Sequence, residues 1–579
     1  MRGMLQAMAI ALLLLLIGRV ALAANAIETL SAEISQAVQS GRNAEGLALA
    51  QKLEGLVRRQ QGTDIMNYAG VLQNQGMFLH NLGRYQEAAD KLNAALAIKL
   101  RRNDPASALR TSGILRASLT ILGRNGEAMS VAQRALAIGT QAFGPDDPRL
   151  SEPLSSLGAL AREQENYKDA ERYFERALAA EQKSPNGSAE DVAEAMDHLG
   201  DLYGLEGRFD DGEKLLQQGL KLLEQAKAQN TTNYAKTLGD LGNLYKDAGR
   251  LAEAEAALSR ALATVRATLG NDHPNVAATM GNLATVLNAS ARFAEAENLN
   301  KQALAIYEKV FGSNHPITAI ALNNLANNYL DQGRADDAMG LQQRVLAIHE
   351  KAFGPDSPDV ARSLNNLANS YKGAGRSAEA GALYQRSLRI LEQKFGEDSA
   401  QTARALSSVA RFAQTSGRLD EAAEKFGRVL RIDEKTRGPD HPSLVDDLRS
   451  LAFLDIQREK YSEARIGLER ALAIAQAKLG PRHRTTLFTE VNLADIIGRQ
   501  GQWPEALALL RRAAADNAGQ GTGGAAVGRF FDLDTALIDA IWQVASGHPD
   551  DAARDEAFRA AQRARETQAG AALAQMAAR

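Results

Sequence analysis

The sequence predicts an all-α protein, a solenoid of about twelve stacked helix-turn-helix repeats. Three observations support this: a turn residue that recurs with a fixed period, an amphipathic pattern before each turn, and small residues at two fixed positions after it. Self-similarity at a fixed period indicates a repeat array. Each unit of such an array packs only against its neighbours, so 579 residues need not divide into several globular domains.

The turn residue, usually a glycine followed by arginine, sets the register. It recurs in steps of 42, apart from one step of 40 between the second and third turns. The twelve positions are Gly41, Gly83, Gly123, Glu165, Gly207, Gly249, Ala291, Gly333, Gly375, Gly417, Glu459 and Gly501.

Each unit is predicted to contain a helix before the turn (helix A) and a helix after it (helix B). In the central unit, Leu322, Leu325 and Tyr329 have the spacing of an amphipathic helix A. Ala338 and Val345 follow the turn and are separated by about two helical turns, so they share one face of helix B. Small side chains on that face allow the paired helices to approach closely.

The loop between units, such as 353–358, has the residues expected at helix ends. Its glycine can adopt the left-handed conformation that ends helix B, and its proline fits the first turn of the next helix A. Ser357, Asp147 and Asn314 are candidate caps for the free amides of such helices.

The pattern L-(G/A)-x-x-Y, then G-R-(Y/F)-x-E-A, then (R/Q)-A-L resembles the tetratricopeptide repeat. The 42-residue period and the loop 270–274 are similar to the kinesin light chain variety, which is longer than the 34-residue form. The resemblance covers roughly residues 60–516 and implies a right-handed superhelix with helix A on its concave side. Units one and two depart from it, and Gln75 stands where a leucine is expected. The aromatic residue after the turn is supplied by Tyr167, Phe209, Phe293 and Tyr461.

The N-terminal segment 1–23 has the pattern of a secretory signal peptide. Arg2 precedes an apolar run over 8–17, and Ala21 to Ala23 forms an A-x-A site, so cleavage is expected after Ala23. The run is shorter than the roughly 20 apolar residues of a spanning helix. We therefore expect an exported protein, periplasmic or secreted, without a membrane contact after cleavage; a retained N-terminal membrane anchor is the alternative.

The rest of the chain is expected to divide into four segments. These are a degenerate capping repeat at 24–62, the repeat array at 63–516, a glycine-rich linker at 517–529, and a helical segment at 530–579. The last segment resembles the linker that precedes CHAT domains, which are caspase-like proteases, in bacterial proteins. It is either an ordinary capping helix or a linker to a missing domain.

Composition and motifs exclude several kinds of chemistry. The chain has no cysteine, which excludes disulfides and thiolate sites, and its net charge of −3 gives no basic field for nucleic acid. No nucleophile elbow follows a strand pattern. We expect no catalytic residues, no cofactor and no metal.

Four histidines occupy one loop position: His273, His315, His441 and His483. One interpretation is a ladder of metal ligands, and the other is helix capping. Zinc ligands lie about 2 Å from one ion, whereas stacked helices are about 8–10 Å apart. Ser357 and Ser399 also interrupt the series, so the spacing favours capping.

A row of polar residues follows the predicted helices A. Asn324, Asn327 and Asp331 lie on one stripe, turned away from Leu325 and Tyr329. An amide both donates and accepts, as binding to a peptide backbone requires. The alternative is that these amides bond across adjacent helices A and fix their stacking. The candidate peptide-binding residues are Asp240, Asn243, Asn282, Asn324, Asn327, Asn366, Asn369 and Asn492.

These observations predict a non-enzymatic scaffold that binds a protein or an extended peptide in a concave groove. The alternative is the regulatory half of a split or truncated CHAT-type protease system, and an enzyme in its own right is a third class. The sequence identifies neither the partner nor the oligomeric state.

Overall fold

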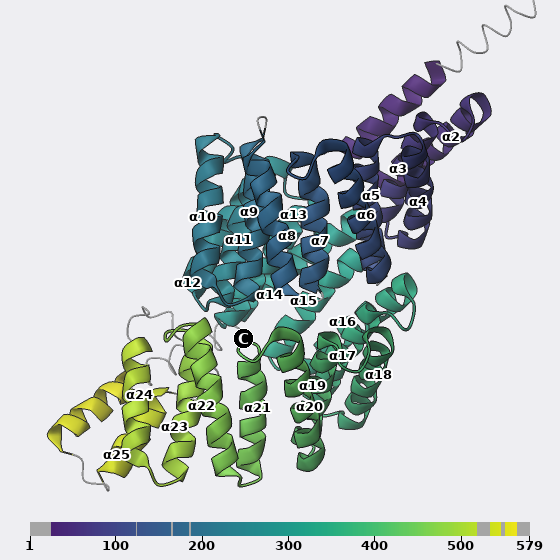
Figure 1. Ribbon diagram of the computed structural model, residues 1–579. Helices are drawn as coiled ribbons and strands as arrows, with labels where there is room; N and C mark the ends of the chain where they lie inside the picture. Colours follow the sequence, from purple (N-terminus) through teal and green to yellow (C-terminus); the bar gives the residue numbers. More distant parts are fainter. Residues whose placement is uncertain are drawn as a thin grey trace, which may run out of the picture. The chain divides into compact units, whose positions relative to one another are not determined.

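The computed structural model describes residues 25–122, 124–163, 166–184, 187–517, 533–545 and 550–563 (Figure 1). These residues form helices joined by short turns, and no strand occurs among them. The predicted all-α class is confirmed. The signal-like segment 1–23, nearly all of the glycine-rich segment and residues 564–579 lie outside the described residues, so the predictions made for them stay predictions.

The chain divides into two compact units, of which the first comprises residues 1–160 with 179–185. Its described part begins with helical residues 25–39. Its further elements, each packed against the next in sequence from α2 to α6, are α2 (Asn43–Gln61), α3 (Met66–Asn81), α4 (Tyr85–Arg101), α5 (Pro105–Ile121), α6 (Asn125–Phe143) and the short 3-10 helix η1 (Pro148–Leu150).

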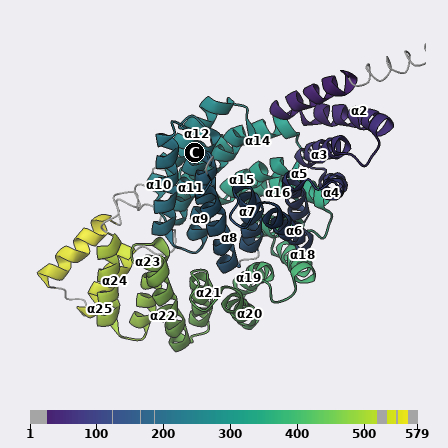
Figure 2. The ribbon, with the colours of Figure 1, turned by 45° about the horizontal axis from the view of Figure 1, so that its top comes forward.

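The second unit comprises residues 161–178 with 186–579, so α7 (Ser151–Glu163) and α8 (Tyr167–Gln182) are divided between the units. From α9 onward the odd-numbered helices are helices A and the even-numbered ones helices B (Figures 1 and 2). They are α9 (Ala189–Leu205), α10 (Phe209–Gln225), α11 (Thr232–Asp247), α12 (Leu251–Leu269), α13 (Pro274–Ala289), α14 (Phe293–Phe311), α15 (Pro316–Asp331), α16 (Ala335–Phe353), α17 (Pro358–Gly373), α18 (Ser377–Phe395), α19 (Ala400–Thr415), α20 (Leu419–Arg437), α21 (Leu444–Gln457), α22 (Tyr461–Lys478), α23 (Arg484–Arg499), α24 (Trp503–Asn517) and α25 (Leu533–Val544).

Small residues on helix A let helix B approach it closely. A Cβ built at Gly242 would lie 2.6 Å from Leu258 Cγ, and one at Gly200 would lie 2.8 Å from Leu216 Cγ. Each leucine is fully buried against the bare backbone of its glycine. On helix B, the predicted small residues Ala338 and Val345 are buried as well.

The first helices A of the second unit touch one another. α9 packs against α11, α11 against α13, and α13 against α15, while no two described helices B make comparable contact. Because the inner arc of a curved stack is shorter than the outer arc, this places helices A on the inner side. We call the side chains that face this inner arc the inner surface.

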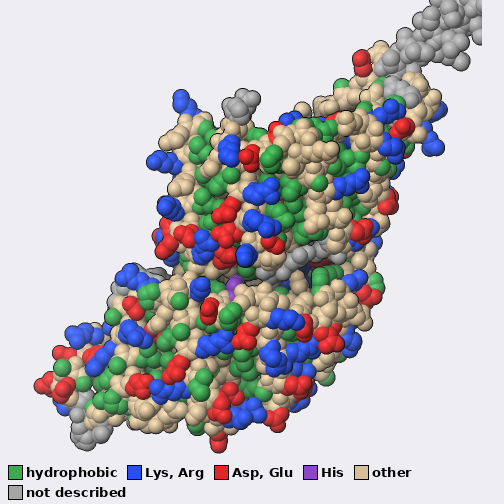
Figure 3. Space-filling model, viewed as in Figure 1, with side chains coloured by type: hydrophobic (Ala, Val, Ile, Leu, Met, Phe, Trp, Pro, Cys, Tyr) green, Lys and Arg blue, Asp and Glu red, His purple; other side chains and the backbone are tan. Residues whose placement is uncertain are grey.

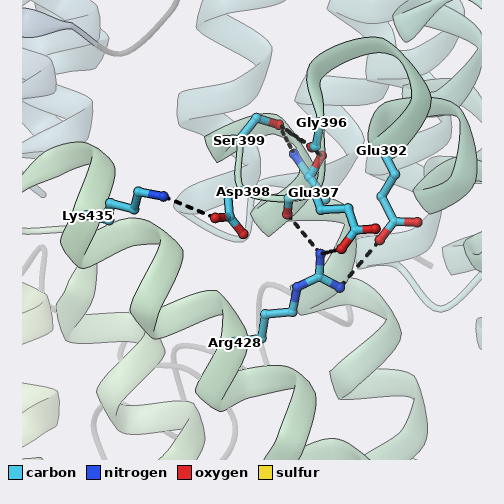
Figure 4. Close-up of polar contacts among 8 residues, drawn as sticks. Glu392, Gly396, Glu397, Asp398, Ser399, Arg428 and Lys435 are labelled. Carbon is cyan, nitrogen blue, oxygen red and sulfur yellow. Dashed lines mark hydrogen bonds and ion pairs between the residues drawn. The ribbon is translucent and has the colours of Figure 1, made fainter.

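On the side of helices B, polar contacts repeat from layer to layer. Arg428 of α20 donates to the backbone oxygen of Glu397 at 2.9 Å and lies 3.5 Å from Glu392 of α18, while Lys435 lies 3.1 Å from Asp398 (Figure 4). Arginines in the same register reach the preceding helix B: Arg344 to Glu308, Arg386 to Glu350 and Arg470 to Glu434. Exposed pairs of this kind contribute only about 0.2–1 kcal/mol each to stability. Their main effect is to keep successive helices B in the same relative position from layer to layer.

The departures at the two ends of the array have structural explanations. Gln75 is buried in α3, and its amide donates to the backbone oxygen of Ala50 at 3.2 Å and to Glu54 at 2.8 Å. At the other end, Ala557 and Ala560 pack in the same core cluster as Leu537 of α25. Residues 551–563 therefore pack against α25, and whether this segment is a cap or a linker stays a prediction.

The turn between helices A and B requires a left-handed backbone. Gly249 and Gly333 have φ angles of 78° and 76° there, but Ala291 and Glu459 adopt 59° without being glycine. A left-handed conformation costs a residue with a Cβ about 1–2 kcal/mol.

We therefore expect Ala291→Gly to raise the free energy of unfolding by about 0.5 kcal/mol, since glycine's greater loss of backbone entropy offsets part of the relief. Urea unfolding followed by circular dichroism measures the change. The matched control is Ala278→Gly at an exposed position inside α13, which should lose about 1 kcal/mol. A loss of stability in both variants would contradict the claim that the backbone at Ala291 is strained.

Candidate functional site: the inner surface of helices A

The polar row predicted from the sequence lies along successive helices A. Asp240 and Asn243 belong to α11, Asn282 to α13, Asn324 and Asn327 to α15, Asn366 and Asn369 to α17, and Asn492 to α23. Asn282 and Asn327 are exposed, and the other members are partly exposed. The row therefore follows the inner surface, but its members differ in what they contact.

Two members of the row are both exposed and without a side-chain hydrogen bond to another described residue. Neither Asn282 nor Asn327 makes a side-chain hydrogen bond to another described residue. Their amides are on adjoining helices and remain accessible, so each can donate to and accept from a bound molecule.

Two other members bond to neighbouring helices, and a third packs against one. Asn366 Nδ2 donates to Asn323 Oδ1 of α15 at 2.8 Å, and the Tyr384 hydroxyl of α18 donates to Asn369 Oδ1 at 2.5 Å. Asn324 packs over α13, where a Cβ built at Gly281 would lie 3.1 Å from Asn324 Nδ2. The row thus combines stacking contacts with accessible amides.

The acidic end of the row is a cluster that the sequence analysis named only through Asp240. Lys236 Nζ of α11 lies 3.0 Å from Asp240 and 3.0 Å from Asp197 of α9, and Arg162 lies 4.0 Å from Asp201. Burial, with repulsion from Asp240, raises the pKa of both Asp197 and Asp201 to about 7. Asp201 nevertheless keeps 34% of its side chain exposed.

The repeat period in the sequence was sufficient to predict part of this cluster. Asp201 precedes Asn243 by one period, so it occupies the inner stripe, whereas Asp197 precedes Gly281 by two periods and is one residue away from that stripe. One period also leads from Asn369 to Arg411 of α19. Burial, with repulsion from Arg411, lowers the pKa of the nearby Lys372 of α17.

Three of the four in-register histidines, His273, His315 and His483, cap helices, as the spacing favours, and His441 makes the same bond to the turn before α21. The backbone N–H of Asn275 donates to His273 Nδ1 at 3.1 Å, and the same bond recurs at His315, His441 and His483 with distances of 3.1–3.2 Å. Nδ1 therefore accepts a hydrogen bond in each case, which fixes the neutral tautomer protonated at Nε2. Ser357 makes the equivalent cap on α17, and Asp147 caps η1.

Two of these histidines also contact repeats that are distant in the sequence but belong to the same unit. His441 stacks on Tyr167 with ring centres 5.5 Å apart, and His483 stacks on Phe209 at 5.7 Å. His483 Nε2 lies 3.1 Å from the backbone oxygen of Asp247 and donates to it. The loops of later repeats thus meet the turns of earlier ones.

The capping histidines make stability dependent on pH. Burial lowers the pKa of His273, His315 and His483 below the ordinary value of 6.5, so the unfolded chain takes up protons more readily than the folded one. We expect the contribution of these three histidines to the free energy of unfolding to be largest above pH 6.5 and to fall as the pH drops below it.

The triple variant His273→Ser, His315→Ser, His483→Ser tests this. Serine keeps the cap, as Ser357 does, and does not titrate, so the variant should lose less stability than the wild type between pH 7.5 and pH 5. Thermal unfolding at both pH values measures the difference. Equal losses in the two proteins would assign the acid sensitivity to other groups.

No helix in the described ranges is long and apolar enough to span a membrane. The architecture is that of a helical-repeat protein with a polar inner surface. The tetratricopeptide repeat family model matches eight overlapping segments that together cover 117–225 and 233–515, more than half of the chain. The chain therefore belongs to the tetratricopeptide repeat family.

Solved structures with similar repeats include a Podosopora anserina protein described as a kinesin light chain with nearly identical TPR-like repeats. It is 27% identical, and the match covers 36% of this chain and 99% of that one with a TM-score of 0.32. A single-residue variant of that protein gives 25% identity, 35% and 96% coverage and a TM-score of 0.32. No curated protein matches this chain.

Proposed function

We propose that the protein is a non-enzymatic scaffold that binds an extended segment of a partner protein on the inner surface of the second unit. The observation that carries this proposal is the pair of accessible, unbonded amides of Asn282 and Asn327 on adjoining helices A. Asparagine is a middling helix former, so helix propensity does not account for its repeated use there.

The spacing of the layers supports an extended ligand. Helices A follow one another at about 8–10 Å, and an extended chain advances about 3.3 Å per residue, so each layer spans about three residues. The backbone N–H and C=O groups of the ligand would then meet an amide at regular intervals. Asp240, Asn243, Asn324 and Asn492 extend the surface along the array.

We further propose that this binding takes place in the periplasm or outside the cell, on the basis of the signal-like segment 1–23. The alternative role, as the regulatory half of a CHAT-type protease system, gains no support from residues 551–563. Their alanines pack in the same core cluster as Leu537 of α25, and the segment that resembles the CHAT linker continues into 564–579, outside the described residues.

The expected effect of Asn282→Ala with Asn327→Ala is a loss of binding without a loss of stability. Peptides selected from a random 16-residue library displayed on phage serve as the probe, and fluorescence anisotropy measures their affinity. Two lost amide contacts should weaken binding about tenfold, since each hydrogen bond contributes about 0.5–1.5 kcal/mol. The melting temperature should stay that of the wild type, because neither side chain bonds within the protein.

Asn366→Ala provides the contrast. It removes the bond to Asn323, so we expect a lower melting temperature and a loss of about 1 kcal/mol of stability. Selection that enriches no peptide, or peptides that bind the double variant as tightly as the wild type, would refute binding on the inner surface.

A further inference from the structure

Within the second unit, loops of late repeats contact turns of early ones. Besides the two histidine stacks described above, the side-chain amide of Gln401 donates to the backbone oxygen of Glu163 at 3.1 Å. These interactions join the turns of repeats four to six to the loops before repeats ten to twelve. We call them the closing contact, and its members are Glu163, Tyr167, Phe209 and Asp247 on the turns and Gln401, His441 and His483 on the loops.

The closing contact recurs in register. Tyr167 and Phe209 each follow a turn between helices A and B and are 42 residues apart, as are the histidines that stack on them. The ring centres, 5.5 and 5.7 Å apart, have the spacing of favourable aromatic pairs. A contact that repeats with the period follows from the rotation of the layers, not from one side chain.

The turn of the fifth repeat is packed against later loops. A Cβ built at Gly207 would lie 3.0 Å from Leu479 Cδ2 and 3.2 Å from Pro442 Cγ. At the equivalent turns of repeats eight and nine, a Cβ built at Gly333 or Gly375 would meet nothing within 4 Å. The close approach is thus specific to the part of the array that faces the late loops.

The closing contact is made by side chains at the edges of the repeats. None of its seven members is buried, and no described helix of repeats four to six packs along a helix of repeats ten to twelve. Figure 3 shows a histidine side chain (purple) accessible at the surface. Regions held by a few exposed contacts open at a small cost in free energy. The closing contact is therefore able to separate without the unfolding of a repeat.

The closing contact turns part of the array into a ring. Repeats five to twelve are each packed against the next, and His483 before the twelfth repeat contacts Phe209 of the fifth. Asn282 and Asn327 belong to helices A of repeats between these two. A free chain end can pass through a ring, whereas a segment between two folded domains enters only when the ring opens.

We propose that the closing contact is a latch that opens to admit an internal segment of a partner protein and closes around it. This inference rests on the proposed function and adds how the inner surface is reached. Closure of this kind holds a bound segment in place and makes its association depend on the population of the open form.

The cap bond orients His483 for the latch. Its Nδ1 accepts the N–H of Thr485 at 3.1 Å, so the opposite side of the ring presents Nε2–H to the oxygen of Asp247. His273 makes the same cap but contacts no distant repeat among the described residues. The cap therefore forms without the latch, and substitutions can separate the two.

The first experiment measures the latch without a partner. Because the chain has no cysteine, Asp210→Cys and Ala477→Cys provide two unique sites for nitroxide labels on α10 and α22. Both residues are exposed and lie outside the closing contact. Double electron–electron resonance measures the distances between the labels. We expect a narrow distribution that becomes longer and broader when His441→Ser and His483→Ser are added.

His273→Ser with His315→Ser is the matched control. Serine keeps the cap, as Ser357 does, and neither control histidine contacts a distant repeat in the described chain. The control should keep the narrow distribution, and circular dichroism checks the fold of every variant. An unchanged distribution after loss of the latch histidines, or equal broadening in the control, would overturn the latch.

The second experiment measures entry. A 16-residue peptide selected from the phage library is used free and inserted between two copies of a small folded domain. A minor open form is typically populated at about 0.1–10%, so making it dominant should speed association of the flanked peptide about 10- to 1,000-fold in the variant without latch histidines. A crosslinker of the measured length between the two introduced cysteines should block the flanked peptide and not the free one.

The outcomes distinguish the latch from the function on which it rests. A flanked peptide that associates equally fast with the wild type, the latch variant and the crosslinked protein would overturn the latch and leave the scaffold intact. Failure to enrich any peptide would overturn the scaffold and the entry role together, while the spin labels still show whether the contact opens. A rate that follows the label distances would establish the latch.

Discussion

The structure depends on the close approach of helices A and B within each layer. Gly76 faces Leu92, Gly200 faces Leu216 and Gly242 faces Leu258, always with the side chain of helix B against the backbone of helix A. Because interiors are packed to high density, a methyl group at this contact displaces its neighbour. Because the same contact recurs in successive layers, each repeat is displaced and rotated relative to the previous one by a similar amount. This regular displacement aligns equivalent side chains along the inner surface.

The alignment explains how a protein without a single core builds an extended polar surface. Residues one period apart, such as Asn282 and Asn324, occupy equivalent places on successive helices A, so one residue type repeated in the sequence becomes a row in space. The contacts on the other side, such as Arg428 with Glu392, hold helices B at matching intervals. Packing supplies the stability, and these polar contacts keep the row in register.

The inner surface combines two uses of the same residue type. Asn366 bonds to Asn323 and so joins two layers, whereas Asn282 and Asn327 keep their amides accessible. An amide can either join two helices or bind another molecule, because it both donates and accepts hydrogen bonds.

The sequence alone determined the class, the repeat period and the register, because a constant period with fixed glycines and leucines leaves one way to pair the helices. It also indicated that histidines such as His315 cap helices, since ligands in separate layers cannot share an ion. It could not separate the roles of Asn324, Asn327 and Asn366, because a one-dimensional pattern specifies a face but not the partner across it.

Only the tertiary structure places Asp197 and Asp201 beside Asp240 and stacks His483 on Phe209 from a much earlier repeat. Both arrangements follow from how far each layer is rotated relative to the previous one. That rotation comes from the packing of many side chains at once, and only the tertiary structure decided it.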